Sequence, residues 1–161
     1  MFMNIEKYIK NNFISKIVET ELDRYINFFN NSYKDNLEHS KFVLNNFPRW
    51  SIISGYYAMH DITKLFLVKK FGIKIENKVH KTTIIIFKEI IEDKEILNLL
   101  ELGYEEFIKM ANDLSEAKKE RLKLQYYTGS EFMAKEYKKK ADIFLNEVVN
   151  PFVSKLNKLI K

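Results

Sequence analysis

The segment from Lys118 to Lys140 is the most basic part of the chain. It carries eight basic residues and three acidic ones, although the whole 161-residue chain has a formal net charge of only +5. Clustered lysines and arginines attract phosphate groups, and the planar guanidinium of Arg121 can hold a phosphate through two parallel hydrogen bonds. The pattern predicts either a phosphate-binding surface that includes Lys118, Arg121 and Lys123 or an ordinary solvated helix face.

Two adjacent tyrosines, Tyr126 and Tyr127, lie in the same segment. A phenol ring can stack on a nucleobase, and its hydroxyl can form a hydrogen bond with the base. A tyrosine at the end of a helix can equally pack its ring into the core and leave its hydroxyl in water. The two tyrosines are therefore candidate base contacts, with core packing as the alternative.

Three histidines, His39, His60 and His80, are the candidate acid–base and metal-binding groups. No two of them have the four-residue spacing that brings two metal ligands onto one helix face, and the chain has no cysteine. We therefore expect no metal and no other cofactor. His60 and Lys64 lie one helical turn apart, so they are candidates for the polar lining of a ligand cleft.

Hydrophobic residues that recur at steps of three and four predict helices along most of the chain. The expected helical ranges are 4–13, 14–47 (one helix, or two with a break near 30–32), 49–71, 80–91, 93–110 (with a break considered at Gly103), 113–127 and 131–160. Pro151 predicts a kink or a break in the last helix near Asn150. Residues 73–79 are expected to form a loop. The β-branched run from Thr82 to Phe87 is expected to be helical, because an isolated strand would have no partner.

The range 49–71 is expected to be the central helix, because apolar residues cover much of its circumference. Pro48 fits the first turn of a helix and Gly72 is a typical terminator, so both ends are marked. The chain has only four glycines and two prolines, and no apolar run approaches the roughly 20 residues that span a bilayer. These features, with the absence of cysteine, predict one cytoplasmic all-α domain over residues 1–161: an up-and-down antiparallel bundle of about five main helices.

The central range also carries a motif that is similar to a known family. In chain order the motif residues are Trp50, Tyr56, Tyr57, Ala58, Met59, Lys64, Gly72, His80 and Lys81. This order resembles the second helix and the following segment of HEPN domains. The residues around Arg121, Tyr126 and Tyr127 resemble the turn before the last helix of that family, and the resemblance extends over residues 20–160 or so.

The resemblance implies a symmetric homodimer with a basic cleft, in which Arg121 of each copy lies near the two-fold axis. Ribonuclease members carry an arginine followed, four to six residues later, by a histidine. Here Tyr126 stands at five residues, and no histidine follows His80. A phenol with a pKa of about 10 stays protonated at neutral pH, whereas an imidazole with a pKa of about 6.5 can act as general base. The chain is therefore similar to HEPN members that lack the ribonuclease histidine.

From this resemblance we expect a non-catalytic protein that binds RNA or a nucleotide, as one half of a prokaryotic toxin–antitoxin or defence pair with a nucleotidyltransferase. One alternative is a metal-independent endoribonuclease in which Arg121 acts with a tyrosine or an upstream histidine. Another is a non-enzymatic dimeric scaffold that docks a partner on the range 89–106, which holds seven acidic residues and one lysine. The candidate ligand contacts are Arg121, Tyr126, Tyr127, Lys118, Lys123, His60 and Lys64.

Overall fold

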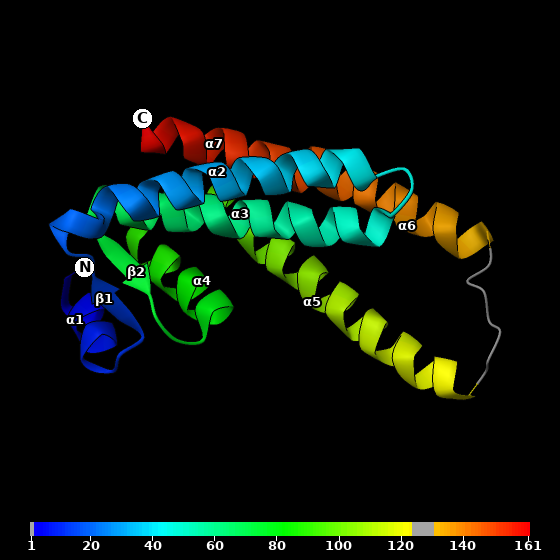
Figure 1. Cartoon of the computed structure of the whole chain (residues 1–161), viewed down its shortest axis with the longest axis horizontal. Helices are drawn as coiled ribbons and strands as arrows, with labels where there is room; N and C mark the ends of the chain where they lie inside the picture. Colours follow the sequence, from blue (N-terminus) through cyan, green and yellow to red (C-terminus); the bar gives the residue numbers. More distant parts are fainter. Residues whose placement is uncertain (1, 124–130) are drawn as a thin grey trace.

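The computed structural model describes the backbone of residues 2–123 and 131–161 and the side chains of residues 5–110 and 135–161. These residues form an all-α helical bundle with one very small sheet, which confirms the predicted fold class. In chain order the elements are α1 (Phe2–Lys10), β1 (Ile14–Lys16), α2 (Glu19–Val43), α3 (Pro48–Phe71), β2 (Ile73–Ile75), α4 (Val79–Ile90), α5 (Lys94–Lys123), α6 (Glu131–Ile143), the π-helix η1 (Phe144–Val149) and α7 (Asn150–Ile160). Figure 1 shows α2 and α3 as an antiparallel pair beside the C-terminal helices, while α5 runs at an angle to them.

Helix α3 is the centre of the bundle. Its side chains are buried around most of the circumference, and it packs against α2, α4, α5, β2 and the C-terminal helices. Pro48 occupies the first turn, where a missing N–H costs nothing, and Gly72 follows the last turn with a φ of 61°, in the left-handed region that glycine tolerates. The Gly72 N–H donates to the carbonyl of Val68. Both predicted ends of the central helix are confirmed.

The prediction of a helix from residue 14 and of a loop over residues 73–79 is wrong at both places. Ile14–Lys16 and Ile73–Ile75 form β1 and β2, which pair antiparallel with Ile14 opposite Ile75. Helix α2 begins only at Glu19. Each strand is three residues long, and its partner lies far away in the sequence. Helical periodicity therefore cannot reveal the pairing, which places β2 beside the ends of α2 and α3.

Within the described residues, neither α2 nor α5 has the break that was considered from the sequence, near residues 30–32 and at Gly103. Helix α2 continues through residues 30–32, and α5 continues through Gly103 into the range predicted as a separate helix from residue 113. A Cβ atom built on Gly103 would come within 2.8 Å of the Met59 side chain on α3. Gly103 therefore allows close packing of α5 on α3 and does not end the helix.

Pro151 changes the helix type locally. Ahead of it, η1 has the wider π-helical turn, in which the Asn150 N–H donates to the carbonyl of Leu145. Proline has no N–H to offer to a regular helical hydrogen bond, and a π-turn beside it re-routes the neighbouring bonds. The helix is not broken near Asn150, because α6, η1 and α7 follow one another without a gap, and the structure shows a change of helix type there. The β-branched run from Thr82 to Phe87 is also helical as predicted, inside α4.

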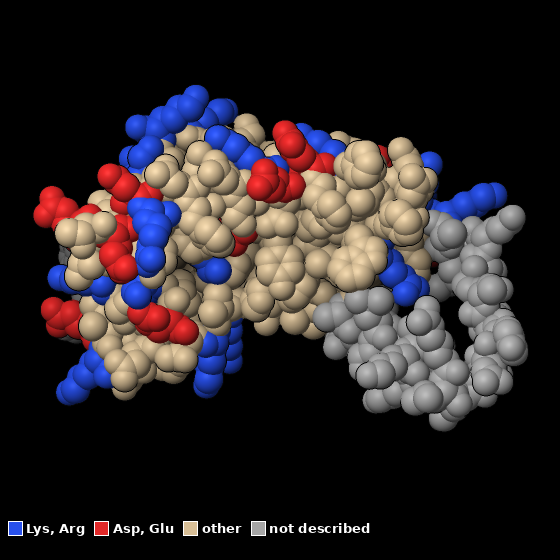
Figure 2. Space-filling model, viewed as in Figure 1, with Lys and Arg blue, Asp and Glu red and all other residues tan. Residues whose placement is uncertain are grey.

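Charge is unevenly distributed on the face of the molecule seen in Figure 2. Acidic and basic side chains gather over the end where α1, β1 and β2 lie, whereas the middle of the face is largely uncharged. Among the residues that the structure describes, no helix is both long enough and apolar enough to cross a bilayer.

Candidate functional site

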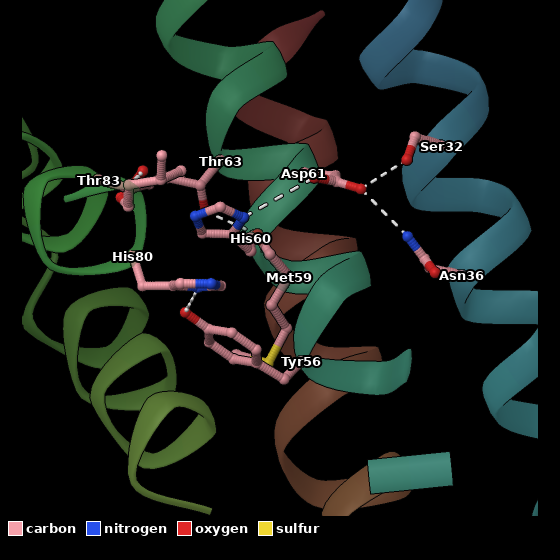
Figure 3. Close-up of polar contacts among 10 residues, drawn as sticks. Ser32, Asn36, Tyr56, Met59, His60, Asp61, Thr63, His80 and Thr83 are labelled. Atoms are coloured by element: carbon pink, nitrogen blue, oxygen red, sulfur yellow. Dashed lines mark hydrogen bonds and ion pairs between the residues drawn. The ribbon is translucent and has the colours of Figure 1, made fainter. Parts of the chain in front are cut away.

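One part of α3 carries a row of polar and titratable side chains. Tyr56, His60, Asp61 and Lys64 follow one another along about two turns, and His80 at the start of α4 packs against them. We call these five residues the α3 polar cluster, of which Figure 3 labels Tyr56, His60, Asp61 and His80. The four-residue spacing of Tyr56, His60 and Lys64 places these three on one face of the helix. Asp61 points away from them toward α2 (Figure 3).

His60 is sealed inside the cluster, with 2% of its surface exposed. Its ring centroid lies 4.6 Å from that of His80, and its Nδ1 lies 3.8 Å from Asp61 Oδ1. Neither ring nitrogen has a hydrogen-bond partner among the described residues. Burial lowers the pKa of His60 to about 4, although the Asp61 carboxylate acts in the opposite direction. The ring is therefore neutral at pH 7 and cannot touch a ligand directly in this conformation.

His80 is held by Tyr56. The Tyr56 hydroxyl and His80 Nδ1 form a 2.9 Å hydrogen bond (Figure 3). Burial raises the pKa of Tyr56, so the phenol stays protonated and can donate this bond, which leaves the proton of a neutral His80 on Nε2. Phe107 of α5 stacks on both rings, with centroid distances of 4.4 Å to Tyr56 and 5.3 Å to His80. His80 is only half-buried, and it is the more accessible histidine of the cluster.

Asp61 ties the cluster to α2. Its Oδ2 accepts hydrogen bonds from Ser32 Oγ at 2.6 Å and from Asn36 Nδ2 at 3.1 Å. Burial acts to raise the pKa of Asp61, but the nearby His60 ring, the Ser32 hydroxyl and the Lys64 charge outweigh it, so the pKa lies below its ordinary value. Asp61 is therefore a buried carboxylate that keeps its negative charge at neutral pH.

Lys64 lines a pocket of about 130 Å³ between α2, α3 and β2. Its Nζ lies 5.2 Å from the centroid of the Phe29 ring, and no described carboxylate lies within ion-pair distance of it. Burial lowers the pKa of Lys64, and the charge of Asp61 partly offsets that effect. The Lys64 ammonium is thus partly desolvated and has an aromatic ring, but no close anion, as its neighbour.

A second lysine completes the polar wall of the pocket. Lys74 Nζ lies 3.3 Å from the Tyr25 hydroxyl and 3.1 Å from Glu76 Oε1. The Tyr25 and Phe29 rings stack with their centroids 6.4 Å apart. We call the group of Tyr25, Phe29, Lys64, Lys74 and Glu76 the lysine–aromatic pocket, because all five residues line the same hollow. It offers cations and flat apolar surface side by side.

The predicted ligand contacts fall into three groups. His60 and Lys64 lie one turn apart on α3, but only Lys64 lines a pocket. The second group is Lys118, Arg121 and Lys123, which belong to the last turns of α5 and whose side chains are outside the described residues. The third group is Tyr126 and Tyr127, which are outside the described residues altogether. An α-helix rises about 1.5 Å per residue, so position 121 lies on the order of 20 Å beyond Phe107 along α5.

Sequence reasoning missed four members of the lysine–aromatic pocket: Tyr25, Phe29, Lys74 and Glu76. Tyr25 and Phe29 are among the hydrophobic residues at helical spacing that predict the helix over 14–47, and Lys74 and Glu76 lie in the range 73–79 that is expected to form a loop. The alternation of Ile73, Lys74 and Ile75 is the signal that indicates a strand here. It is too short to be specific, because a three-residue alternation occurs often by chance.

Within the described residues, no group of three or more histidine, aspartate and glutamate side chains is arranged to hold a metal ion. Comparisons of the chain with protein-family models, with curated proteins and with solved structures gave no match. The geometry of the site combines a sealed histidine and an open lysine on α3 with an oriented histidine at the start of α4.

Proposed function

We propose that this chain is a HEPN-like protein that binds RNA or a nucleotide without cleaving it. The observation that carries the proposal is the lysine–aromatic pocket, in which the unpaired Lys64 ammonium stands beside two stacked rings and a second lysine. Lysines pair with phosphates and aromatic rings stack on bases, so this combination suits a nucleic acid or a nucleotide. The basic range 118–140 adds long-range attraction for a polyanion.

The histidines favour binding over cleavage. Metal-independent RNA cleavage needs an accessible general base close to the group that holds the phosphate. His60 is buried, and His39, which shares a 2.7 Å hydrogen bond with Ser54, is not among the residues that line the pocket. His80 stacks on Phe107, and the Arg121 position lies on the order of 20 Å further along α5. Within one chain this spacing separates the arginine from the histidines.

We also propose that two copies associate. Three large aromatic side chains near the α2–α3 turn are mostly exposed: Phe42 at 85%, Phe47 at 61% and Trp50 at 54%. Exposed apolar patches of this kind are typical of protein contact sites. Such a homodimer would act as one half of a toxin–antitoxin or defence pair, with a nucleotidyltransferase as its partner.

A metal-independent endoribonuclease is the second candidate, and the Tyr56–His80 contact is the observation that favours it. Burial lowers the pKa of His80, so the imidazole is neutral at pH 7, and the Tyr56 hydroxyl fixes its orientation. A neutral, oriented and half-exposed imidazole is the kind of group that acid–base chemistry on RNA requires. In this mechanism Arg121 of one copy would have to meet His80 of the other.

One assay separates these functions. Labelled single-stranded RNA is incubated in chelator with the wild type, Lys64→Ala, Arg121→Ala and Lys69→Ala, and both binding and cleavage are scored. Lys69 is exposed on the same helix as Lys64, so it is a matched control. We expect the wild type and Lys69→Ala to bind without cleavage, and the other two variants to bind about tenfold less tightly or worse.

Two outcomes would change the conclusion. RNA cleavage that the wild type performs and His80→Ala does not would replace binding by the endoribonuclease function. Unchanged affinity in both Lys64→Ala and Arg121→Ala would overturn the binding proposal. Circular dichroism of each variant shows whether the fold is intact.

A further inference from the structure

We infer that the lysine–aromatic pocket binds a terminal phosphate, that is, the phosphate monoester at the end of an RNA chain or of a nucleotide. The inference rests on the proposed function, because it specifies which part of the ligand enters the pocket. Three properties of the pocket carry it: its small size, its two lysines and the competing carboxylate of Glu76.

The size of the pocket favours the end of a chain over its middle. The hollow holds about 130 Å³, and Leu67, Val68 and Ile73 add apolar wall to the polar residues already described. An internal phosphodiester has chain on both sides, so it needs a groove that is open at both ends. A phosphate monoester is attached on one side only and can enter a small hollow end-on.

The charge of the pocket favours a doubly charged group. A phosphate monoester has a second pKa of about 6, so it carries close to two negative charges at pH 7, whereas an internal phosphodiester carries one. Lys64 and Lys74 supply two positive charges from different elements, α3 and β2. Partial burial disfavours the Lys64 ammonium, and an incoming phosphate would give it the close anion that the described residues do not supply.

Glu76 opposes an anion in the same pocket. Its Oε1 lies 3.1 Å from Lys74 Nζ and accepts a 2.5 Å hydrogen bond from Ser15 Oγ. These contacts hold the pKa of Glu76 below its ordinary value, so the carboxylate is charged and partly neutralises the positive charge of Lys74. A bound phosphate therefore competes with Glu76 for Lys74. It follows that Glu76→Gln should raise the affinity for phosphate, whereas the lysine substitutions should lower it. A purely structural role of these residues does not predict opposite effects on affinity.

The stacked rings lie where the rest of the ligand would begin. Tyr25 and Phe29 border the same hollow as the two lysines, and the Tyr25 hydroxyl accepts a hydrogen bond from Lys74. A sugar or base attached to the phosphate can pack on these rings as it leaves the pocket. The pocket thus offers charged groups and aromatic rings in one hollow.

The test compares three RNAs of one sequence with an internal fluorophore: one with a 5′-phosphate, one with a 3′-phosphate and one with hydroxyls at both ends. Fluorescence anisotropy gives the dissociation constants. We expect one phosphorylated RNA to bind about tenfold more tightly than the hydroxyl RNA, a difference of about 1.4 kcal/mol. Lys64→Gln and Lys74→Gln should remove this preference, and Glu76→Gln should enlarge it. Lys70→Gln, an exposed position on α3, should preserve it.

The outcomes distinguish the two proposals. Equal affinity of the wild type for all three RNAs overturns the terminal-phosphate inference and leaves RNA binding intact. Binding of AMP that is lost in Lys64→Gln, without binding of any RNA, supports the terminal-phosphate site and overturns RNA as the ligand. Absence of both RNA and AMP binding overturns both proposals. Circular dichroism of the glutamine variants verifies that a lost preference does not come from unfolding.

Discussion

His60 and Lys64 lie one turn apart on the same face of α3, yet their surroundings are opposite. His60 is 2% exposed and packed among aromatic rings, whereas Lys64 lines a hollow of about 130 Å³. Burial lowers the pKa of both groups, but only the histidine is closed off from solvent. The comparison shows that helical spacing brings polar groups to one side of α3, while the neighbouring elements make one of them core and the other a candidate ligand contact.

The elements that pack beside His60 and beside Lys64 differ in how much of the helix surface they cover. On the His60 side, α4 and α5 bring in large rings, including Phe107, which fill the space around Tyr56. On the Lys64 side, the neighbour is the three-residue strand β2, and a strand this short leaves part of the helix surface uncovered. The closed region should therefore govern stability and the open region should govern binding.

Replacing Tyr56 by alanine should have the largest effect, because it empties the closed region. We expect the free energy of unfolding to fall by about 3–5 kcal/mol, the range for a large buried aromatic side chain. Lys64→Ala should cost at most about 1 kcal/mol, since it removes a cation–π contact with Phe29 near the surface. Urea unfolding measures both values, and equal losses would contradict the division into a closed and an open region.

A loss of stability in acid should be the next largest effect. The pKa of His60 is lowered from 6.5 to about 4 in the folded chain, so the unfolded chain binds the proton first. The contribution of neutral His60 is complete above pH 6.5 and is lost as the pH falls toward 4, by on the order of 3 kcal/mol. His80 acts in the same direction, because burial lowers its pKa as well. Asp61, whose pKa is lowered, stabilises the folded chain at neutral pH, and this contribution is lost only when the pH falls below the ordinary pKa of a carboxyl group.

His60→Leu isolates the contribution of this one ring. Leucine fills the cavity without ring nitrogens, so the free energy of unfolding should depend less on pH between 7 and 4. At pH 7 the variant should be as stable as the wild type or more so, because two unpaired buried nitrogens have been removed. Urea unfolding at several pH values gives the slopes, and parallel curves for the two proteins would rule out His60 as the source.

Ser32→Ala, at the contact between Asp61 and α2, should have a smaller effect than the loss of Tyr56 or the acid titration of His60. This change removes a 2.6 Å hydrogen bond to a charged carboxylate and should cost about 1.5 kcal/mol. It should also raise the pKa of Asp61, which the Ser32 hydroxyl helps to lower. An NMR titration of the Asp61 carboxyl checks the direction. Asn31→Ala, at an exposed neighbouring position, should leave both quantities unchanged.

Much of the fold was predictable because its causes are local. Pro48 and Gly72 mark the ends of α3 through their own backbone chemistry, and the disturbance ahead of Pro151 follows from a missing N–H. The helical state of Thr82 to Phe87 followed from the lack of a neighbouring strand partner. The β1–β2 pairing was not predictable, since Ile14 meets Ile75 only after the chain has folded back.

The candidate site also has features that the sequence predicts and features that only the tertiary structure decides. Residue types and helical spacing were enough to bring His60 and Lys64 onto one face of the central helix, because 3.6 residues per turn is a property of the helix alone. The burial of these two side chains could not be predicted from the sequence. It depends on rings from α4 and α5 on the His60 side and on a short strand on the Lys64 side. Lys74 entered the site only through that strand. Burial and pocket shape are set by contacts between distant segments, and these contacts separate the sealed histidine from the open lysine.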